Sequence, residues 1–294
     1  MKTYLRSSKF VARLAITPFV VIVLLIFVGC VGWSVQLSFT NSKLLPNGDF
    51  VGLDQYYRLF RTTRWIVSLK NMLLFGVFFV SGALILGFLL AILLDQKIRA
   101  EAFFRTIFLY PYSLSFVVTG LAWQWFLNPS LGLQNAVREL GWSSFTFDWL
   151  TDQSMAIYTI VIAAIWHGSG LVMALMLAGL RGVDPEIWRA SKIDGIPTWR
   201  VYVHIVAPIL GPVIFASVVL LSLSVVKGFD IVVAMTNGGP GIATEVPAKF
   251  VLDHILERAN VGLAMAGATI MLITVISALA PWLYVQHMRK RNSP

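Results

Sequence analysis

Residue types that commonly carry catalysis do not form a recognisable constellation in this 294-residue sequence. We find no metal-ligand cluster and no catalytic triad, and the phosphate-binding pattern G-x-x-x-x-G-K-[ST] is absent. The sequence therefore predicts no catalytic residue, no metal site and no cofactor bound by this chain. The chain has instead a polar segment, 184–212, DPEIWRASKIDGIPTWRVYVHIVAPILGP, between two long apolar segments. Such a segment suits binding to another surface.

The start of this polar segment has the signals of a helix fixed at both ends. Asp184 is a favourable amino-terminal cap, and Pro185 suits the first helical position because its missing N–H costs nothing there. Gly195 supplies a left-handed cap and Pro197 bars continuation, so the helix should end at Asp194. A second helix should start near Thr198 and lead into the next apolar segment.

Two interpretations of this short helix remain open from its residues alone. Trp188, Trp199 and the neighbouring basic residues could anchor it on the surface of a membrane. Alternatively, its fixed ends make it a rigid docking surface for a partner protein.

The composition predicts that most of the chain crosses a membrane. Hydrophobic residues make up 57% of the sequence and charged residues only 13%, about half the share of a soluble domain. Several apolar runs exceed the roughly 18 residues that mark a spanning helix. We expect an all-α, polytopic membrane protein, with spans at about 16–38, 71–94, 106–127, 155–180, 206–229 and 262–285.

The distribution of charge predicts the orientation of these spans. Residues 1–15 carry four basic residues and no acid, which is typical of a cytoplasmic amino terminus. Six spans then place the carboxyl terminus and the loop 181–205 in the cytoplasm as well, and the segments on that side hold more Lys and Arg than the others. The net charge of +9 is explained in this way, and no basic block is dense enough to predict nucleic-acid binding.

The loop 181–205 resembles a signature of permease subunits from binding-protein-dependent ABC importers. That signature reads Glu-Ala-Ala, two residues, Asp-Gly-Ala, then a downstream proline. Here the matching residues are Arg189-Ala190-Ser191, Asp194-Gly195-Ile196 and Pro208. Arg189 replaces the signature glutamate, and Ile196-Pro197 replaces the usual small residue and its successor.

Other segments extend the resemblance over nearly the whole chain. Residues 50–60, 103–135, 228–251 and 262–266 resemble segments of the carbohydrate-importing, maltose-permease-like branch. Within that branch, EIWRASKIDGIPTW at 186–199 is most similar to glucose and mannose importers.

The resemblance implies a type I (MetI-like) permease fold in the bacterial inner membrane, where lipid surrounds it. It implies an importer with a second permease as heterodimer partner, two cytosolic ATPases that bind ATP and Mg, and an extracytoplasmic sugar-binding protein. The chain itself would be a transport subunit and not an enzyme. The residues expected to couple it to an ATPase are Glu186, Trp188, Arg189, Ala190, Ser191, Asp194, Gly195 and Pro208.

Polar and aromatic residues within the spans are candidates for a sugar path, because sugars bind aromatic faces and short polar side chains. The candidates are Trp166, His167, Ser169, Ser222, Ser224, Lys227 and Asp230. A charged residue in a span is a functional-site hypothesis by default. However, Lys227 and Asp230 are three residues apart and could simply form an ion pair on one helix, and His167 could serve packing or an inter-subunit hydrogen bond.

Two other functions fit the sequence less well. An ion-coupled secondary sugar carrier acting alone would use Asp230 and His167 as proton or sodium ligands, but we find no inverted repeat and it would not need the capped cytoplasmic helix. A membrane enzyme acting on lipid-linked sugars would need a cluster of carboxylates at a membrane face, and the sequence has none.

Overall fold

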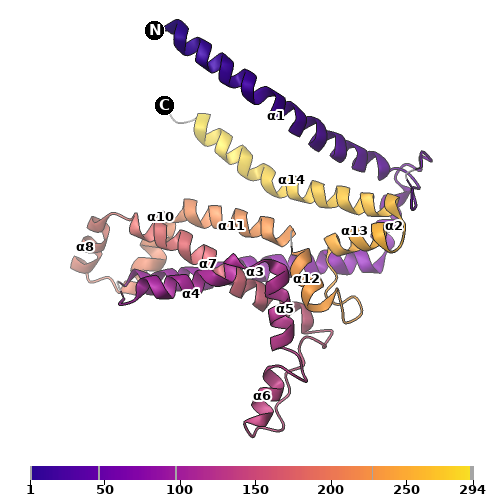
Figure 1. Ribbon diagram of the computed structural model, residues 1–294. Helices are drawn as coiled ribbons and strands as arrows, with labels where there is room; N and C mark the ends of the chain where they lie inside the picture. The colour runs from indigo at the N-terminus through magenta and orange to yellow at the C-terminus, as the bar shows by residue number, and fades with distance from the viewer. Residues whose placement is uncertain (1, 46, 97, 227, 292–294) are drawn as a thin grey trace. The chain divides into compact units, whose positions relative to one another are not determined.

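The protein is helical throughout the residues described by the computed structural model, which are 2–45, 47–96, 98–226 and 228–291 (Figure 1). Side chains are described between residues 15 and 277, apart from the three internal gaps. Within this part of the chain the only β-type pairing is an isolated antiparallel bridge between Thr40 and Phe50. The all-α prediction is confirmed.

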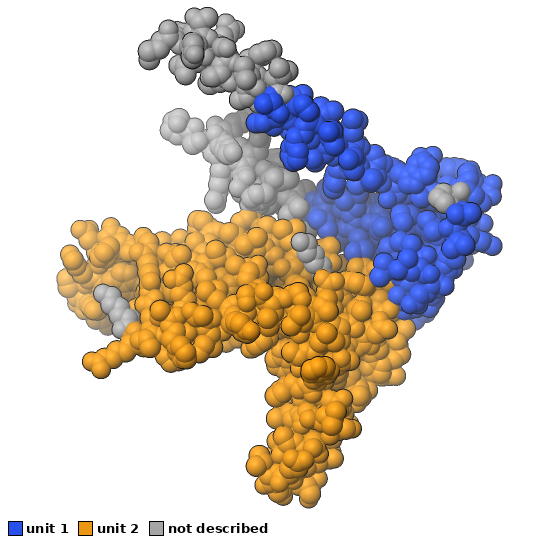
Figure 2. Space-filling model, in the orientation of Figure 1, with its two compact units in different colours: residues 1–65, 250–294 blue, residues 66–249 orange. Residues whose placement is uncertain are grey.

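The chain forms two compact units, coloured separately in Figure 2. Unit 1 comprises residues 1–65 and 250–294, and unit 2 comprises residues 66–249. Two helices contribute to both units, namely α3 (Thr63–Asp95) and α13 (Pro247–Leu256). Each unit is therefore described by itself below.

Unit 1 contains α1 (Lys2–Leu37), α2 (Asp54–Arg61) and α14 (Val261–Arg291), with α14 packed against both others. Buried polar contacts hold the connection between α1 and α2: the Gln55 side chain donates to Thr40 O at 3.0 Å. A Cβ on Gly262 would lie 2.3 Å from the same carbonyl oxygen, so only glycine lets α14 approach this loop. The first turn of α3 joins α13 through the Arg64–Asp253 ion pair at 2.5 Å.

Unit 2 is built around α7 (Ala156–Arg181), which is largely buried. The helices packed against it are α4 (Glu101–Ser113), α5 (Phe116–Phe126), α11 (Gly211–Val226) and α12 (Phe229–Thr236). Its hydrophobic core includes Phe79, Ile160, Met173 and Leu221, all nearly inaccessible to solvent. Helix α6 (Leu133–Glu139) lies in the loop between α5 and α7.

A sharp bend interrupts the segment for which the sequence predicts a single span over 106–127. Helices α4 and α5 meet at 100°. Leu114 and Ser115 are extended at this point, and the Ser115 side chain accepts a hydrogen bond from Val118 N–H, which starts a new helix. Pro111 already removes one backbone donor from the end of α4, so the polypeptide turns here instead of continuing straight.

A second bend of 74° divides the segment predicted as a span over 206–229. As expected, helical structure starts at Thr198, with α9 (Thr198–Arg200), followed by the π-helical turn η1 (Val201–Val206) and α10 (Ala207–Ile209). Pro208 lacks the N–H that a regular α-helix would use at this position, which fits a widened turn just before it. Among the described residues, α11 then extends to Val226, and α12 begins at Phe229, where the predicted span ends.

Three helical segments in the described part of the chain are long and apolar enough to cross a membrane: Ala15–Leu37, α3 and α7. The two bent pairs raise this number to five if each pair is one span. Helix α14 covers the predicted sixth span at 262–285, although its side chains beyond residue 277 are outside the described residues.

Candidate coupling helix and substrate path

The predicted capped helix is α8, which extends over Pro185–Ile193. The Asp184 carboxylate accepts a hydrogen bond from Glu186 N–H at 2.8 Å. Pro185 occupies the first turn, where no N–H is required, and Glu186 places a negative charge near the positive end of the helix dipole. The start of α8 is therefore set by residues adjacent in sequence.

The carboxyl end of α8 is closed by a Schellman motif. Gly195 has a φ of +65°, a conformation that glycine adopts without steric cost. Gly195 N–H donates to Lys192 O at 3.3 Å, and Ile196 N–H donates to Ser191 O at 3.0 Å. These two bonds satisfy carbonyls that would otherwise lack partners, so α8 is rigid at both ends.

One face of α8 packs onto the rest of unit 2. The Trp188 ring meets the Tyr202 ring edge-on at 5.2 Å, and the Tyr202 hydroxyl accepts a hydrogen bond from Gln96 at 3.0 Å. Ser191 is buried and donates to Trp188 O. A movement of α8 would thus displace residues in η1 and at the end of α3 that contact it directly or through Tyr202.

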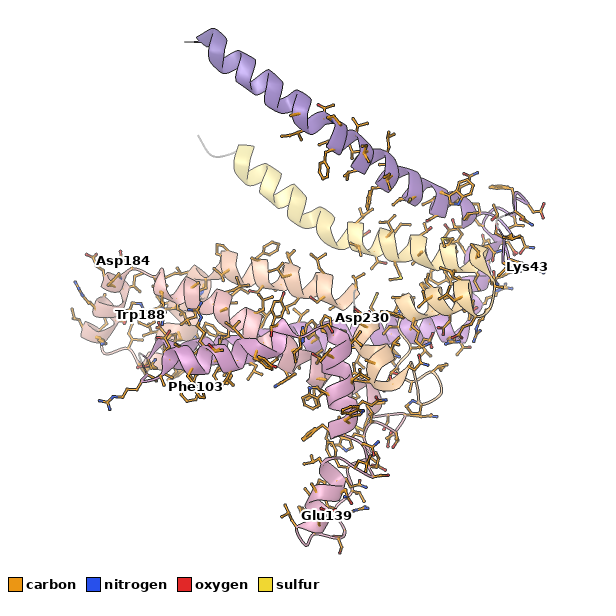
Figure 3. All side chains as sticks on the ribbon, viewed as in Figure 1. Lys43, Phe103, Glu139, Asp184, Trp188 and Asp230 are labelled. Atoms are coloured by element: carbon orange, nitrogen blue, oxygen red, sulfur yellow. The ribbon has the colours of Figure 1, made fainter. Side chains whose placement is uncertain are left out.

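The opposite face of α8 is open to solvent. Exposed residues here are Glu186, Arg189, Ala190, Lys192, Ile193, Asp194 and Gly195. Ile193 is 86% exposed, although it is a large apolar residue. Figure 3 shows Asp184 and Trp188 at one end of unit 2, away from Asp230 and Glu139. Pro208 is exposed in α10 and marks the bend.

The candidate path residues on α7 are held mainly by packing. His167 is 4% exposed, stacks on Phe116 with ring centres 4.3 Å apart, and its Nδ1 lies 3.0 Å from the Thr119 hydroxyl. Trp166 is partly exposed and its ring meets Trp123 edge-on at 6.0 Å. These contacts favour the packing interpretation of His167.

The remaining path candidates are not joined to this group. Ser169 and Ser224 donate to backbone carbonyls of their own helices, Trp166 O and Leu220 O. Ser222 is exposed on α11. Among the described side chains, no side-chain to side-chain hydrogen bond connects these serines with Trp166 or His167.

The expectation that Lys227 and Asp230 form an ion pair on one helix stays a prediction, because it involves Lys227. Among the described residues, α11 extends to Val226, and α12 begins at Phe229 with Gly228 as its cap. Asp230 is exposed in the first turn of α12, where the helix dipole favours a negative charge. Lys227 itself lies outside the described residues.

Sequence reasoning missed Thr119 and Phe116, which position the His167 ring. Both lie on α5, and the bend between α4 and α5 brings them to α7. The available local signal was Ser115, whose side chain can start a helix, but the direction of α5 is a tertiary property.

The sequence profile of one protein family, the binding-protein-dependent transport system inner membrane component, matches residues 83–290. A probable ABC transporter permease of Pyrococcus horikoshii is 41% identical over 255 residues, covering 86% of this chain and 87% of that protein. The xylose/arabinose import permease of Haloferax volcanii is 32% identical, and the match covers 92% of this chain and 86% of that protein. The trehalose/maltose permease of Thermococcus litoralis is 27% identical, covering 97% and 96%.

Solved structures agree on the fold. A chain from a bacterial ABC transporter that imports alginate matches with a TM-score of 0.79 at 20% identity, covering all of both chains. A second chain, from the alginate transporter in complex with its pentasaccharide-bound periplasmic protein, matches with a TM-score of 0.78 at 22% identity, covering 99% and 96%.

Proposed function

The chain belongs to the binding-protein-dependent transport system inner membrane component family, and we propose that it is the permease subunit of an ATP-driven sugar importer. Its relatives are ABC transporter permeases, which are transport components and not enzymes. The family is a multi-pass inner-membrane family. The secondary-carrier alternative has no support among these relatives.

The observation that carries the coupling role is the structure of α8. It follows directly after the spanning helix α7, is capped at both ends, and exposes Arg189 and Ile193, four residues apart, on one face. A rigid helix anchored through Trp188 can transmit a displacement to Tyr202 and the bent segment beyond it. We infer that α8 docks onto a cytosolic ATPase, with Arg189 in place of the family's glutamate.

The class of substrate follows from the relatives. Permeases for xylose and arabinose and for trehalose and maltose align over most of the chain, which supports a sugar. A glucose or mannose substrate remains our finer prediction, based on residues 186–199. The candidate path residues of α7 and α11 stay part of this proposal.

The proposed assembly contains a second permease, two ATPases that hold ATP and Mg, and an extracytoplasmic binding protein. A solved relative of the same fold was captured with a periplasmic protein carrying a pentasaccharide. Both termini of this chain and α8 would lie in the cytoplasm.

Replacing Gly195 with proline tests the coupling role. Proline fixes φ near about −65°, so it cannot adopt the +65° of Gly195, and it removes the N–H that bonds Lys192 O. We expect ATP-driven sugar uptake by the assembled importer to be lost while the amount of membrane-inserted protein is unchanged.

The matched control is Gly52→Pro, which also replaces a glycine of positive φ (+58°) but lies before α2. This variant should retain most of the uptake. Wild-type uptake by Gly195→Pro would contradict the coupling role of α8.

A further inference from the structure

A pocket of about 420 Å³ lies in unit 2, between the carboxyl-terminal ends of α5 and α12. Its walls also include the turn at residues 128–129, residues 150–151 before α7, and the loop after α12. None of the predicted sugar-path residues lines it. Its volume falls within the range of small-molecule sites.

The lining of this pocket is neutral and rich in hydrogen-bonding groups. Three carboxamides line it, from Gln124, Asn128 and Asn237, together with the hydroxyls of Thr151 and Thr236. Apolar surface comes from residues such as Leu150 and Pro240, and the described lining has no charged side chain. We name this site the carboxamide pocket.

The carboxamides retain capacity to bind a ligand. Within the described residues, the side chains of Gln124 and Asn237 make no hydrogen bond to protein, so each offers both a donor and an acceptor. The Asn128 oxygen accepts from Ser130 and Leu131 N–H, which leaves its NH₂ group available. Amide groups of this kind pair equally well with hydroxyl donors and acceptors.

The pocket is held in shape by close packing and by the loop after α12. A Cβ on Gly120 of α5 would lie 2.6 Å from Ala234 Cβ of α12, so these two walls approach more closely than other residues would allow. Asn237 has a left-handed φ of 49°, and the Thr236 and Thr244 hydroxyls are 2.7 Å apart. Asn71 also holds the loop after α12 in place, because its side chain donates hydrogen bonds to Ala243 O and Glu245 O, both at 2.9 Å.

The carboxamide pocket and α8 lie at opposite ends of α7. Residues 150–151 precede the first turn of α7, and α8 begins four residues after its last turn. The 26 residues of α7 span about 39 Å, more than the roughly 30 Å of a bilayer core. In Figure 1, α8 and the α5–α6 region likewise lie at different ends of unit 2. If α8 lies on the cytoplasmic side of the membrane, the pocket lies on the extracytoplasmic side.

We propose that the carboxamide pocket binds one ring of a neutral sugar at the extracytoplasmic entrance, before the sugar reaches the translocation path. This inference rests on the proposed import function. Neutral carboxamides and hydroxyls match sugar hydroxyl groups, whereas a carboxylated sugar would bring an uncompensated charge to a site without a cation.

Binding to the full-length chain assembled with the second permease and the ATPases, in the absence of the sugar-binding protein, tests the pocket directly. Saturation-transfer NMR titrations would use methyl α-glucopyranoside, xylose and trehalose as neutral probes and glucuronate as the acidic one. Gln124→Leu and Asn237→Gly each remove a carboxamide, and glycine keeps the left-handed backbone of position 237. We expect each variant to weaken binding of the neutral probe about fivefold, the effect of one net hydrogen bond.

The matched control is Gln153→Leu, which removes an exposed carboxamide outside the pocket. It should bind like the wild type. The proposal is overturned if no neutral probe binds, if glucuronate binds as tightly, or if the two pocket variants bind unchanged.

Uptake measurements separate this proposal from the import function. The pocket variants should raise the KM for sugar uptake about fivefold with a nearly unchanged maximal rate, whereas Gly195→Pro should abolish uptake and leave probe binding intact. A wild-type complex that binds the probe but takes up no sugar with ATP would refute the import function alone. Uptake with an unaltered KM in both variants would refute the pocket alone.

Discussion

Individual glycines set how closely the helices of unit 2 approach. A Cβ on Gly170 of α7 would lie 2.1 Å from the carbonyl oxygen of Phe108 on α4, a backbone atom that cannot rotate away. We therefore predict that Gly170→Ala destabilises the protein by about 1–3 kcal/mol, because the two helices must separate. The melting temperature of the purified protein in detergent measures this.

Gly211→Ala is the control for this prediction. Nothing lies within 4 Å of a Cβ at Gly211, the first residue of α11. The free energy of unfolding of Gly211→Ala should differ from that of the wild type by less than about 1 kcal/mol, since only the intrinsic helix preference of this position is altered. Equal melting temperatures for the two variants would show that α4 and α7 do not pack as described.

His254 predicts a pH dependence of stability at the residue scale. The ring is 3% exposed in α13, outside the candidate spans, and its Nδ1–H donates to Phe250 O at 2.8 Å. Burial is the main cause that lowers the pKa of His254 below its usual value; the hydrogen bond to Phe250 O and the charge of Asp253 oppose this shift, and Arg258 and Arg64 support it. The unfolded chain consequently takes up a proton at higher pH than the folded one.

The sign of the effect follows from this difference. Above about pH 6.5, His254 is neutral in both states and has no effect on the free energy of unfolding. As the pH falls towards the lower folded-state pKa, the unfolded chain binds the proton first, and the free energy of unfolding decreases. Melting temperatures at pH 7.5 and 5.5 should differ less in His254→Gln than in the wild type. A variant with the wild-type pH dependence would exclude His254 as its source.

At the scale of elements, one ion pair connects the start of α3 with α13 inside unit 1. The Asp253 side chain is only 6% exposed and lies 2.5 Å from Arg64. Arg64→Gln removes the cation that lies next to this buried carboxylate, which we expect to cost about 3–5 kcal/mol. Thermal unfolding in detergent again provides the measurement.

The chain contains a matched surface pair for comparison. Arg58 and Asp54 on α2 are 2.8 Å apart, but their side chains are 59% and 46% exposed. Arg58→Gln should change stability by less than about 1 kcal/mol, because water screens the interaction. If Arg58→Gln lost as much stability as Arg64→Gln, burial would not control the free-energy cost of breaking an ion pair.

At the scale of the whole molecule, the orientation in the membrane can be tested on both sides of α7. Cys30 is the single cysteine, so Arg189→Cys and Gln153→Cys in a Cys30→Ser background carry one thiol each. Both positions are exposed. An impermeant maleimide should label Gln153→Cys on intact cells and Arg189→Cys only after lysis. The reverse pattern would place α8 outside and rule out its contact with a cytosolic ATPase.

Local features of the fold were readable from residues close in sequence. Asp184, Pro185 and Gly195 act on backbone groups only one to three residues away, and α8 has nearly the predicted bounds. The positions of α1, α3 and α7 follow from their uninterrupted apolar length, because a bilayer requires it. The sequence alone therefore determined the helical class, the main spans and the capped helix.

Only the tertiary structure decided where the chain bends and which side chains meet. The 100° turn between α4 and α5 places Thr119 beside His167, 48 residues later. The carboxamide pocket likewise joins residues 124, 128 and 237. Such contacts depend on how distant helices pack, which apolar periodicity and capping residues do not encode.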